Sequence, residues 1–133
     1  MGGDEVTKGE VSKFIPAEPD VIWSLVGQFG GIEDWLPDID SCDVDGDQRV
    51  VHTVGMTIHE RLLHRDDALR TISYQIVESP IPLDHHRATI SVTPDSGGAR
   101  IGWSFEVRPD HFAPAFAQNY EGCLAFLAAR FDG

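Results

Sequence analysis

The segment from His111 to Phe131 constrains the fold most, because it carries the period of one long amphipathic helix. Its apolar side chains recur every three or four residues, a spacing that places them on one helical face. They are Phe112, Phe116, Tyr120, Leu124 and Leu127, with Cys123 and Phe131 beside them. Residues 43–108 instead alternate like antiparallel strands joined by turns. We therefore predict that the helix lies on the concave side of a curved sheet and that the two enclose a space.

Length and charge limit what this space can serve. A chain of 133 residues predicts a single domain, 1–133, with one main cavity. It carries 22 acidic and 10 basic residues, a net charge of −12, which repels nucleic acid and anionic membrane surfaces. We find no apolar run of membrane-spanning length and no secretion signal, so a cytoplasmic location is expected, with Cys42 and Cys123 as free thiols.

Two short helices are predicted after the first strand. Residues 6–15 alternate as a strand, and the Pro-Ala-Glu-Pro turn that follows can open a helix, since proline in the first turn loses no hydrogen bond. This helix is expected over residues 20–29 and to stop at Gly30-Gly31, with a short second helix over 32–36. Its buried face is formed by Ile22, Leu25, Val26 and Phe29.

The next segment predicts a hairpin whose two strands can be registered. Gly55-Met56 suits a two-residue turn with glycine first. The register then pairs Thr53 with Ile58, Val51 with Glu60, and Arg49 with Leu62. The face predicted to be interior carries Ile58, Glu60, Leu62 and His64, whereas Arg61, Leu63 and Arg65 point outward.

Three further strands are predicted over residues 71–78, 86–92 and 101–107. A three-residue loop places Tyr74 opposite Leu62, and a four-residue loop places Trp103 opposite Ile90. The inward side chains are then Ile72, Tyr74, Ile76, His86, Ala88, Ile90, Val92, Ile101, Trp103, Phe105 and Val107. Asp110 is expected to cap the final helix or its lead-in.

A strand, two short helices, a run of antiparallel strands and a long C-terminal helix is the element order of the START-like or SRPBCC superfamily. The chain resembles the bacterial polyketide cyclase/dehydrase branch of this helix-grip superfamily, which also includes the birch pollen allergen. The segments that carry the resemblance are Val21 to Val26, Trp35-Leu36-Pro37, His59 to Leu63 with Asp66-Asp67, Thr71 to Tyr74, and Trp103-Ser104-Phe105. The resemblance implies an α+β fold with a hydrophobic cavity for a small, largely apolar molecule. Related proteins act as cyclases, lyases or carriers, so the fold alone does not select a chemistry.

Four polar residues on the predicted inner face are candidate catalytic groups. Glu60, in an apolar cavity, has a carboxylate whose pKa should rise toward values useful for proton transfer; a plain salt bridge with Arg49 is an equally open interpretation. Tyr74 can donate to a developing enolate or be a core tyrosine with its hydroxyl at the rim. His86 can serve acid–base chemistry or be a satisfied structural histidine.

The walls of the cavity are predicted to be aromatic and aliphatic. The substrate-binding residues are expected to be Trp35, Leu62, Ile72, Ile90, Trp103, Phe105, Phe112, Phe116 and Tyr120, each with core packing as the alternative. Asp38 and Asp40 are interpreted as loop carboxylates at the mouth. Adjacent strand residues point to opposite faces, so His85-His86 is not expected to bind a metal, and the sequence has no cofactor motif.

These observations predict a cofactor-independent cyclase or related lyase that acts on a polyketide-like or other apolar, carbonyl-bearing intermediate. Glu60 and His86 would transfer protons, and Tyr74 or Arg49 would stabilise negative charge. A carrier of the same fold without chemistry is the first alternative. A protein that binds a partner through its acidic surface is the second, and the even scatter of acidic residues disfavours it. A homodimer is compatible with the sequence but is not readable from it.

Overall fold

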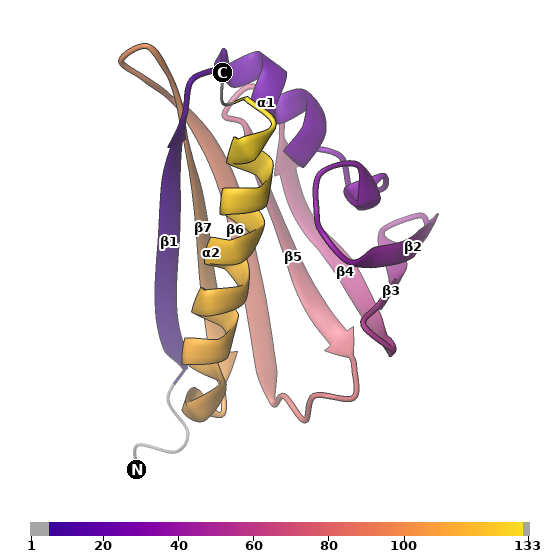
Figure 1. Cartoon of the computed structure of the whole chain (residues 1–133). Coiled ribbons are helices and arrows are strands. Elements are labelled where there is room, and N and C mark those ends of the chain that lie inside the picture. The colour runs from indigo at the N-terminus through magenta and orange to yellow at the C-terminus, as the bar shows by residue number, and fades with distance from the viewer. Residues whose placement is uncertain (1–5, 132–133) are drawn as a thin grey trace.

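The computed structural model describes residues 6–131 as one curved antiparallel sheet with a long helix on its concave side (Figure 1). The strand order is β1-β7-β6-β5-β4-β3-β2. The strands are β1 (Thr7–Ile15), β2 (Ile39–Asp45), β3 (Gln48–Thr53), β4 (Met56–Asp66), β5 (Thr71–Glu78), β6 (His85–Asp95) and β7 (Gly98–Arg108). The helices are α1 (Pro19–Val26) and α2 (Ala113–Ala129), with short 3-10 turns η2 (Ile32–Asp34) and η3 (Asp110–Phe112). The predicted α+β helix-grip fold is confirmed.

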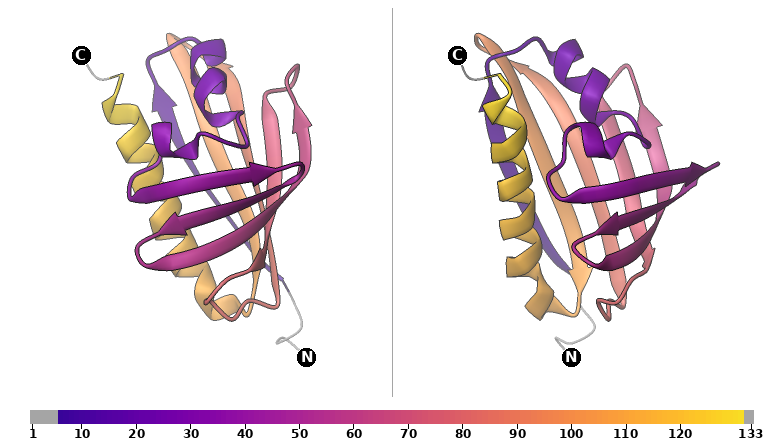
Figure 2. Two further views of the ribbon diagram at one scale, coloured as in Figure 1. Left: turned by 90° about the vertical axis from the view of Figure 1, so that its right-hand side faces the viewer. Right: turned by 45° about the vertical axis from the view of Figure 1, so that its right-hand side comes forward.

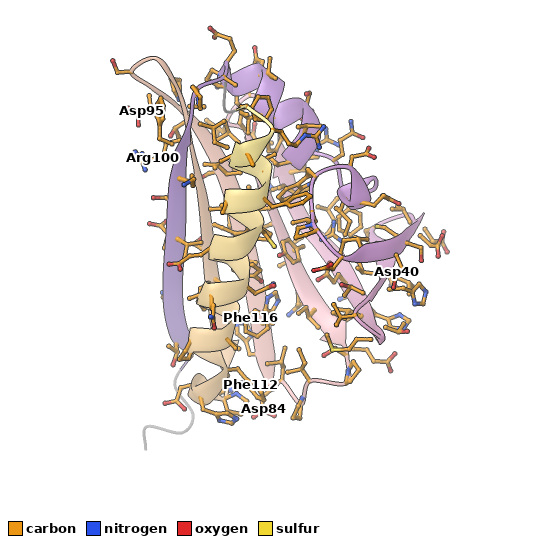
Figure 3. All side chains as sticks on the ribbon, in the orientation of Figure 1. Asp40, Asp84, Asp95, Arg100, Phe112 and Phe116 are labelled. Carbon is orange, nitrogen blue, oxygen red and sulfur yellow. The ribbon has the colours of Figure 1, made fainter. Side chains whose placement is uncertain are left out.

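Helix α2 lies along the β1–β7 side of the sheet (Figures 1 and 2). It does not extend over the strands on the other side of the sheet, β3 and β4. The face predicted from helical spacing is the buried one. Tyr120, Cys123, Leu124 and Leu127 are buried. Phe112, at the end of η3, and Phe116, in the first turns of α2, are partly buried and pack against the core (Figure 3). Asp95 and Arg100 form an ion pair of 3.1 Å on the β6–β7 hairpin, far from these rings.

The helix boundaries differ from the sequence-based ones in three places. Helix α1 ends at Val26, because the Gly27 N–H bonds to the Trp23 carbonyl and closes the last turn. The predicted second helix is only the 3-10 turn η2. The chain from His111 onward begins as the 3-10 turn η3, and the Asp110 side chain makes no capping hydrogen bond to it or to α2.

The β3–β4 hairpin has a different register from the predicted one. Its turn consists of Val54 and Gly55, with φ of 48° and 77°. Two positive φ angles form the turn whose twist matches that of paired strands, and this outweighs the strain at Val54. The pairs are therefore Thr53 with Met56, Val51 with Ile58, and Arg49 with Glu60. The slip from the predicted pairing is two residues, so the side chains of this hairpin as far as Leu62 keep their predicted faces.

A β-bulge near the end of β4 gives the last side chains of this strand a direction opposite to the predicted one. Leu62 pairs with Tyr74 as predicted, but the next paired residue is His64, opposite Ser73, so Leu63 is the extra residue. The bulge reverses the alternation, which turns His64 outward to solvent. Arg65, predicted to point outward, comes onto the inner face with its guanidinium 6.0 Å from the centre of the Trp23 ring.

The later strands have the predicted register. Trp103 pairs with Ile90, with a two-residue turn at Ser96-Gly97 in place of the expected four-residue loop. Strands β5 and β6 pair only from Thr71–Tyr74 to Ala88–Ser91, and they diverge beyond Tyr74. Strand β2, which was not predicted as a separate strand, forms the outer edge next to β3.

Close packing at one glycine gives a test of this arrangement. A Cβ on Gly98 would lie 2.3 Å from the Ile15 carbonyl oxygen, so Gly98→Ala should lower the free energy of unfolding by about 1–3 kcal/mol. Gly122, in α2, has open space around it, and Gly122→Ala should raise that free energy by about 0.5–1 kcal/mol. Chemical denaturation measures both variants. Equal effects at the two sites would contradict the β1–β7 packing.

Candidate functional site

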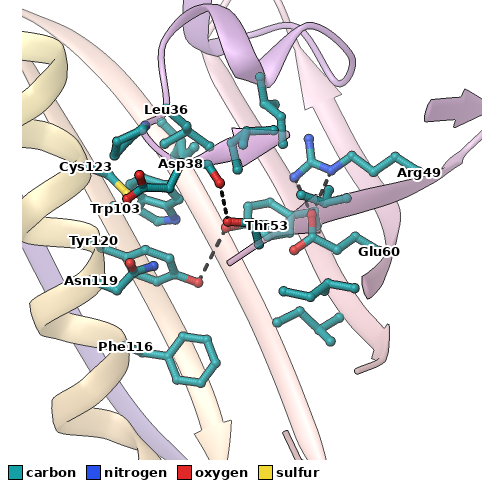
Figure 4. A pocket seen from close by; sticks show the side chains of 18 of the residues that line it. Leu36, Asp38, Arg49, Thr53, Glu60, Trp103, Phe116, Asn119, Tyr120 and Cys123 are labelled. Carbon is teal, nitrogen blue, oxygen red and sulfur yellow. Dashed lines mark hydrogen bonds and ion pairs between the residues drawn. The ribbon is translucent and has the colours of Figure 1, made fainter. Parts of the chain in front are cut away.

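A cavity of about 480 Å³ lies between α2, the inner faces of β3, β4 and β5, and the loop that follows η2 (Figure 4). Most of its wall is apolar. It is lined by ten of the thirteen predicted site residues: Trp35, Arg49, Glu60, Ile72, Tyr74, Ile90, Trp103, Phe112, Phe116 and Tyr120. The fold thus brings together residues from strands β3 to β7, from the loop after η2, and from η3 and α2.

The other three predicted site residues do not line the cavity. Leu62 is half-buried and packs against the edge of the core. Phe105 is buried under β1, where its ring occupies the space that a side chain at Gly9 would need. His86 is 1% exposed and lies behind Tyr120. The strand pattern gives the face of these residues but not what covers them. Phe105 is covered by β1, and His86 is covered by Tyr120 of α2.

Arg49 and Glu60 form a buried ion pair directly across the β3–β4 hairpin. Arg49 Nε and Nη2 each lie 2.7 Å from Glu60 Oε1, and Arg49 Nη1 donates to the Phe29 carbonyl at 2.7 Å. The guanidinium also lies 4.4 Å from the centre of the Phe29 ring and 4.9 Å from that of Tyr74. The arginine is therefore held on all sides, whereas the second carboxylate oxygen of Glu60 is turned toward the cavity (Figure 4).

The charge state of Glu60 depends on two opposing effects. Burial raises the pKa of its carboxyl group, and the charge and hydrogen bonds of Arg49 lower it. Burial is the larger effect, so the pKa of Glu60 lies above its ordinary value. A carboxylate with a raised pKa and an oxygen facing an apolar cavity can accept a proton from a bound molecule.

Tyr74, Tyr120 and His86 form a second polar group, which begins beside the ion pair, since Tyr74 is on the strand next to Glu60, and extends to α2. Tyr74 Oη lies 3.4 Å from Tyr120 Oη, which lies 3.1 Å from His86 Nε2. Burial raises the pKa of both phenols, so both keep their protons. Burial, with a smaller effect from His85, lowers the pKa of His86 to about 4. From the sequence we would expect a pKa in the neutral range for His86, as acid–base chemistry at that position would need, and this expectation is wrong.

Several residues that line the cavity were absent from the predicted site. Asn119 is on the cavity side of α2, three residues after Phe116, a helical spacing that could have identified it. Cys123 also lines the wall, and burial raises the pKa of its thiol to about 11. The Thr53 hydroxyl donates to the Asp38 carbonyl at 2.7 Å. This hydrogen bond connects β3 to the loop between η2 and β2, which we call the mouth loop. The place of Thr53 at the cavity depends on the path of that loop, which has no local sequence signal.

The residues considered for metal binding point apart. His85 contacts Glu106 at 3.1 Å on the outer side, whereas His86 points inward. Within residues 6–131, no three His, Cys, Asp or Glu side chains gather as metal ligands would. Asp38 lines the mouth of the cavity, and Asp40 is exposed on β2. Within the same range, no helix is long and apolar enough to cross a membrane.

Comparison with known proteins agrees with this architecture. Residues 6–132 match the family described as polyketide cyclase/dehydrase and lipid transport. The protein XoxI from Bacillus cereus is 28% identical over 94% of this chain and 95% of that chain, with a TM-score of 0.89. Ara h 8.0201 (18% identity, 96% and 98% covered, TM-score 0.78) and major latex-like protein 151 from Panax ginseng (14%, 96% and 99%, 0.79) share the fold. No protein of curated function matches the sequence.

The buried ion pair predicts a pH-dependent loss of stability. Arg49→Met should lower the free energy of unfolding by about 3–5 kcal/mol, because it leaves the Glu60 carboxylate buried without a partner. Without Arg49 the pKa of Glu60 rises further. A raised folded-state pKa gives stability at low pH that is lost as the pH rises through it, so the deficit should be larger at about pH 8 than at about pH 5.

The double variant Arg49→Met/Glu60→Leu is the matched control, since it removes both charges and should recover much of the lost stability. Urea denaturation at the two pH values measures all three proteins. A deficit that does not change with pH, or a double variant as unstable as the single one, would contradict the buried pair.

Proposed function

The chain belongs to the polyketide cyclase/dehydrase and lipid transport family, and from this premise we propose that it binds a small, apolar, carbonyl-bearing molecule in its cavity and cyclises it without a cofactor. A related elimination would use the same groups. The observation that carries the proposal is a carboxylate, Glu60, facing an apolar cavity of about 480 Å³. This volume is typical of pockets for small molecules, which span about 300–1,000 Å³.

The proposed chemistry begins with confinement. A flexible chain held between the flat rings of Trp103, Phe116 and Tyr120 has fewer conformers, so its reacting carbons meet more often. Glu60 then takes a proton from the carbon next to a carbonyl group, and its raised pKa makes it a stronger base than an ordinary carboxylate. The enolate carbon attacks a second carbonyl carbon of the same molecule, and Glu60 returns the proton to the alkoxide oxygen that this attack forms. Arg49 keeps the carboxylate in place through contacts to its other oxygen.

Negative charge that develops on the carbonyl oxygen needs hydrogen-bond donors. Tyr74, on the strand next to Glu60, and Tyr120, on α2, both line the cavity, and their protonated phenols can donate to that oxygen. His86 is outside the cavity, so it is not proposed as a proton-transfer group. The roles of base and donor thus fall to different residues that line the same cavity.

A carrier without chemistry is the second candidate function. The observation that favours it is the short contact of Glu60 Oε1 with two nitrogens of Arg49, because an ion pair of this kind lowers the basicity of the carboxylate. Binding alone would need only the apolar wall and a polar anchor. The two functions therefore differ in whether Glu60 moves a proton.

Hydrogen exchange at a bound ketone separates the two without knowledge of the natural substrate. In D₂O the protein should accelerate the exchange of the acetyl hydrogens of 2-acetylnaphthalene for deuterium. Proton NMR measures the rate of this exchange. Glu60→Gln should reduce this acceleration by about a hundredfold to ten-thousandfold, because the amide is not a base. Binding of the ketone without accelerated exchange would contradict the enzyme and support the carrier.

Two tryptophan variants on α2 serve as controls for location. Asn119→Trp places a large ring at the cavity, and it should abolish both binding and exchange. Gln118→Trp adds the same ring one residue earlier, at an exposed position off the cavity, and should leave both unchanged. Equal activity of the two variants would show that the ketone binds elsewhere.

A further inference from the structure

The direction of the hydrogen bonds behind the cavity wall follows from one backbone contact. Strands β5 and β6 diverge after Tyr74, and the Ile76 N–H donates instead to His86 Nδ1 at 3.1 Å. A backbone N–H is only a donor, so Nδ1 must be the acceptor. The neutral ring then carries its proton on Nε2, which donates to Tyr120 Oη at 3.1 Å.

This direction leaves one hydroxyl proton without an acceptor. Tyr120 Oη accepts from His86, and the contact of 3.4 Å between Tyr120 Oη and Tyr74 Oη uses only one of the two phenol protons. If Tyr74 donates to Tyr120, the Tyr120 proton remains; in the reverse case the Tyr74 proton remains. Either way, one donor of this pair remains, and both tyrosines line the cavity.

Two indole groups add to the surplus of donors. Trp103 stacks on Tyr120 at 4.1 Å between ring centres, and Trp35 lies 5.7 Å from Trp103. Both tryptophans line the cavity, and they are 3% and 2% exposed. Among the described residues, neither Nε1 has a hydrogen-bond acceptor. A buried donor without a partner is costly, so this wall is unusual in holding several.

We propose that the Tyr74–Tyr120 pair forms an anchor with one spare hydroxyl proton that selects ligands bearing a carbonyl oxygen at this point, with His86 as the positioning residue that sets its direction. The inference rests on the proposed function and deepens it, because it places the ligand's acceptor at the tyrosine wall and not at Arg49. A ketone, aldehyde or ester can accept from this anchor, whereas a hydrocarbon of the same shape cannot.

Two ligands of matched shape test the anchor by calorimetry: 2-acetylnaphthalene and 2-ethylnaphthalene, which differ in the carbonyl oxygen. The readout is the ratio of the two affinities for one protein. The two ligands differ in hydrophobicity by the same amount in every experiment, so this difference cancels when the ratios of two proteins are compared. Tyr74→Phe/Tyr120→Phe should lower the preference for the ketone by about threefold to tenfold, the value of one hydrogen bond. The carbonyl stretch of the bound ketone should also move to higher wavenumber in this variant.

Ser73→Ala is the control, because Ser73 lies on the outer face of β5 and bonds to Thr89 at 2.8 Å. It should keep the wild-type preference. An unchanged ratio in the double tyrosine variant would overturn the anchor and leave cavity binding intact. If neither naphthalene binds the wild-type protein, the proposed function and the anchor both fail.

The tautomer of His86 provides a test that needs no variant. Long-range proton–nitrogen NMR of the wild-type protein at neutral pH should give the pattern of a neutral ring protonated on Nε2. A ring protonated on Nδ1 would overturn the inference, since Tyr120 would then donate to His86 and no hydroxyl proton would remain for a ligand.

Discussion

One helix is too narrow to cover the concave face of a seven-stranded sheet. A helix is about 10 Å wide and neighbouring strands are about 4.8 Å apart, so a helix covers roughly two strands. Helix α2 lies along the β1–β7 side and seals the core there. The inner side chains of β3, β4 and β5 are left without a helix, and the mouth loop closes over them only in part. The cavity is the direct result of this mismatch.

The polar groups of the cavity form two clusters with different roles, and Tyr74 contacts both. In the first, Arg49 is held by Glu60, the Phe29 carbonyl and the rings of Phe29 and Tyr74, so it acts as a fixed support for the carboxylate. In the second, a chain of hydrogen bonds runs from the Ile76 backbone through His86 to the tyrosines. An acceptor from a base and donors from a hydroxyl pair therefore face one apolar space, which is the arrangement that proton transfer next to a carbonyl needs.

Periodicity predicted the helix-grip fold and most of the cavity residues, since the faces of α2, β5, β6 and β7 depend only on local spacing. It placed Glu60 correctly although the hairpin register was wrong by two residues, because a shift of two preserves the face. It failed at His64, where the bulge at Leu63 reverses the alternation without any sequence signal. Periodicity also placed His86 in the cavity, which is wrong. A strand pattern gives the face of a residue, but it does not show that Tyr120 of α2 lies between His86 and the cavity.

Native mass spectrometry of the protein purified from its own organism, before and after denaturation, tests the central claim most directly. The account predicts one small, apolar molecule per chain, which is released on unfolding and carries at least one carbonyl group. A preparation with the mass of the bare chain that also takes up no 2-acetylnaphthalene would contradict it, because an apolar cavity of about 480 Å³ with surplus donors would then remain empty.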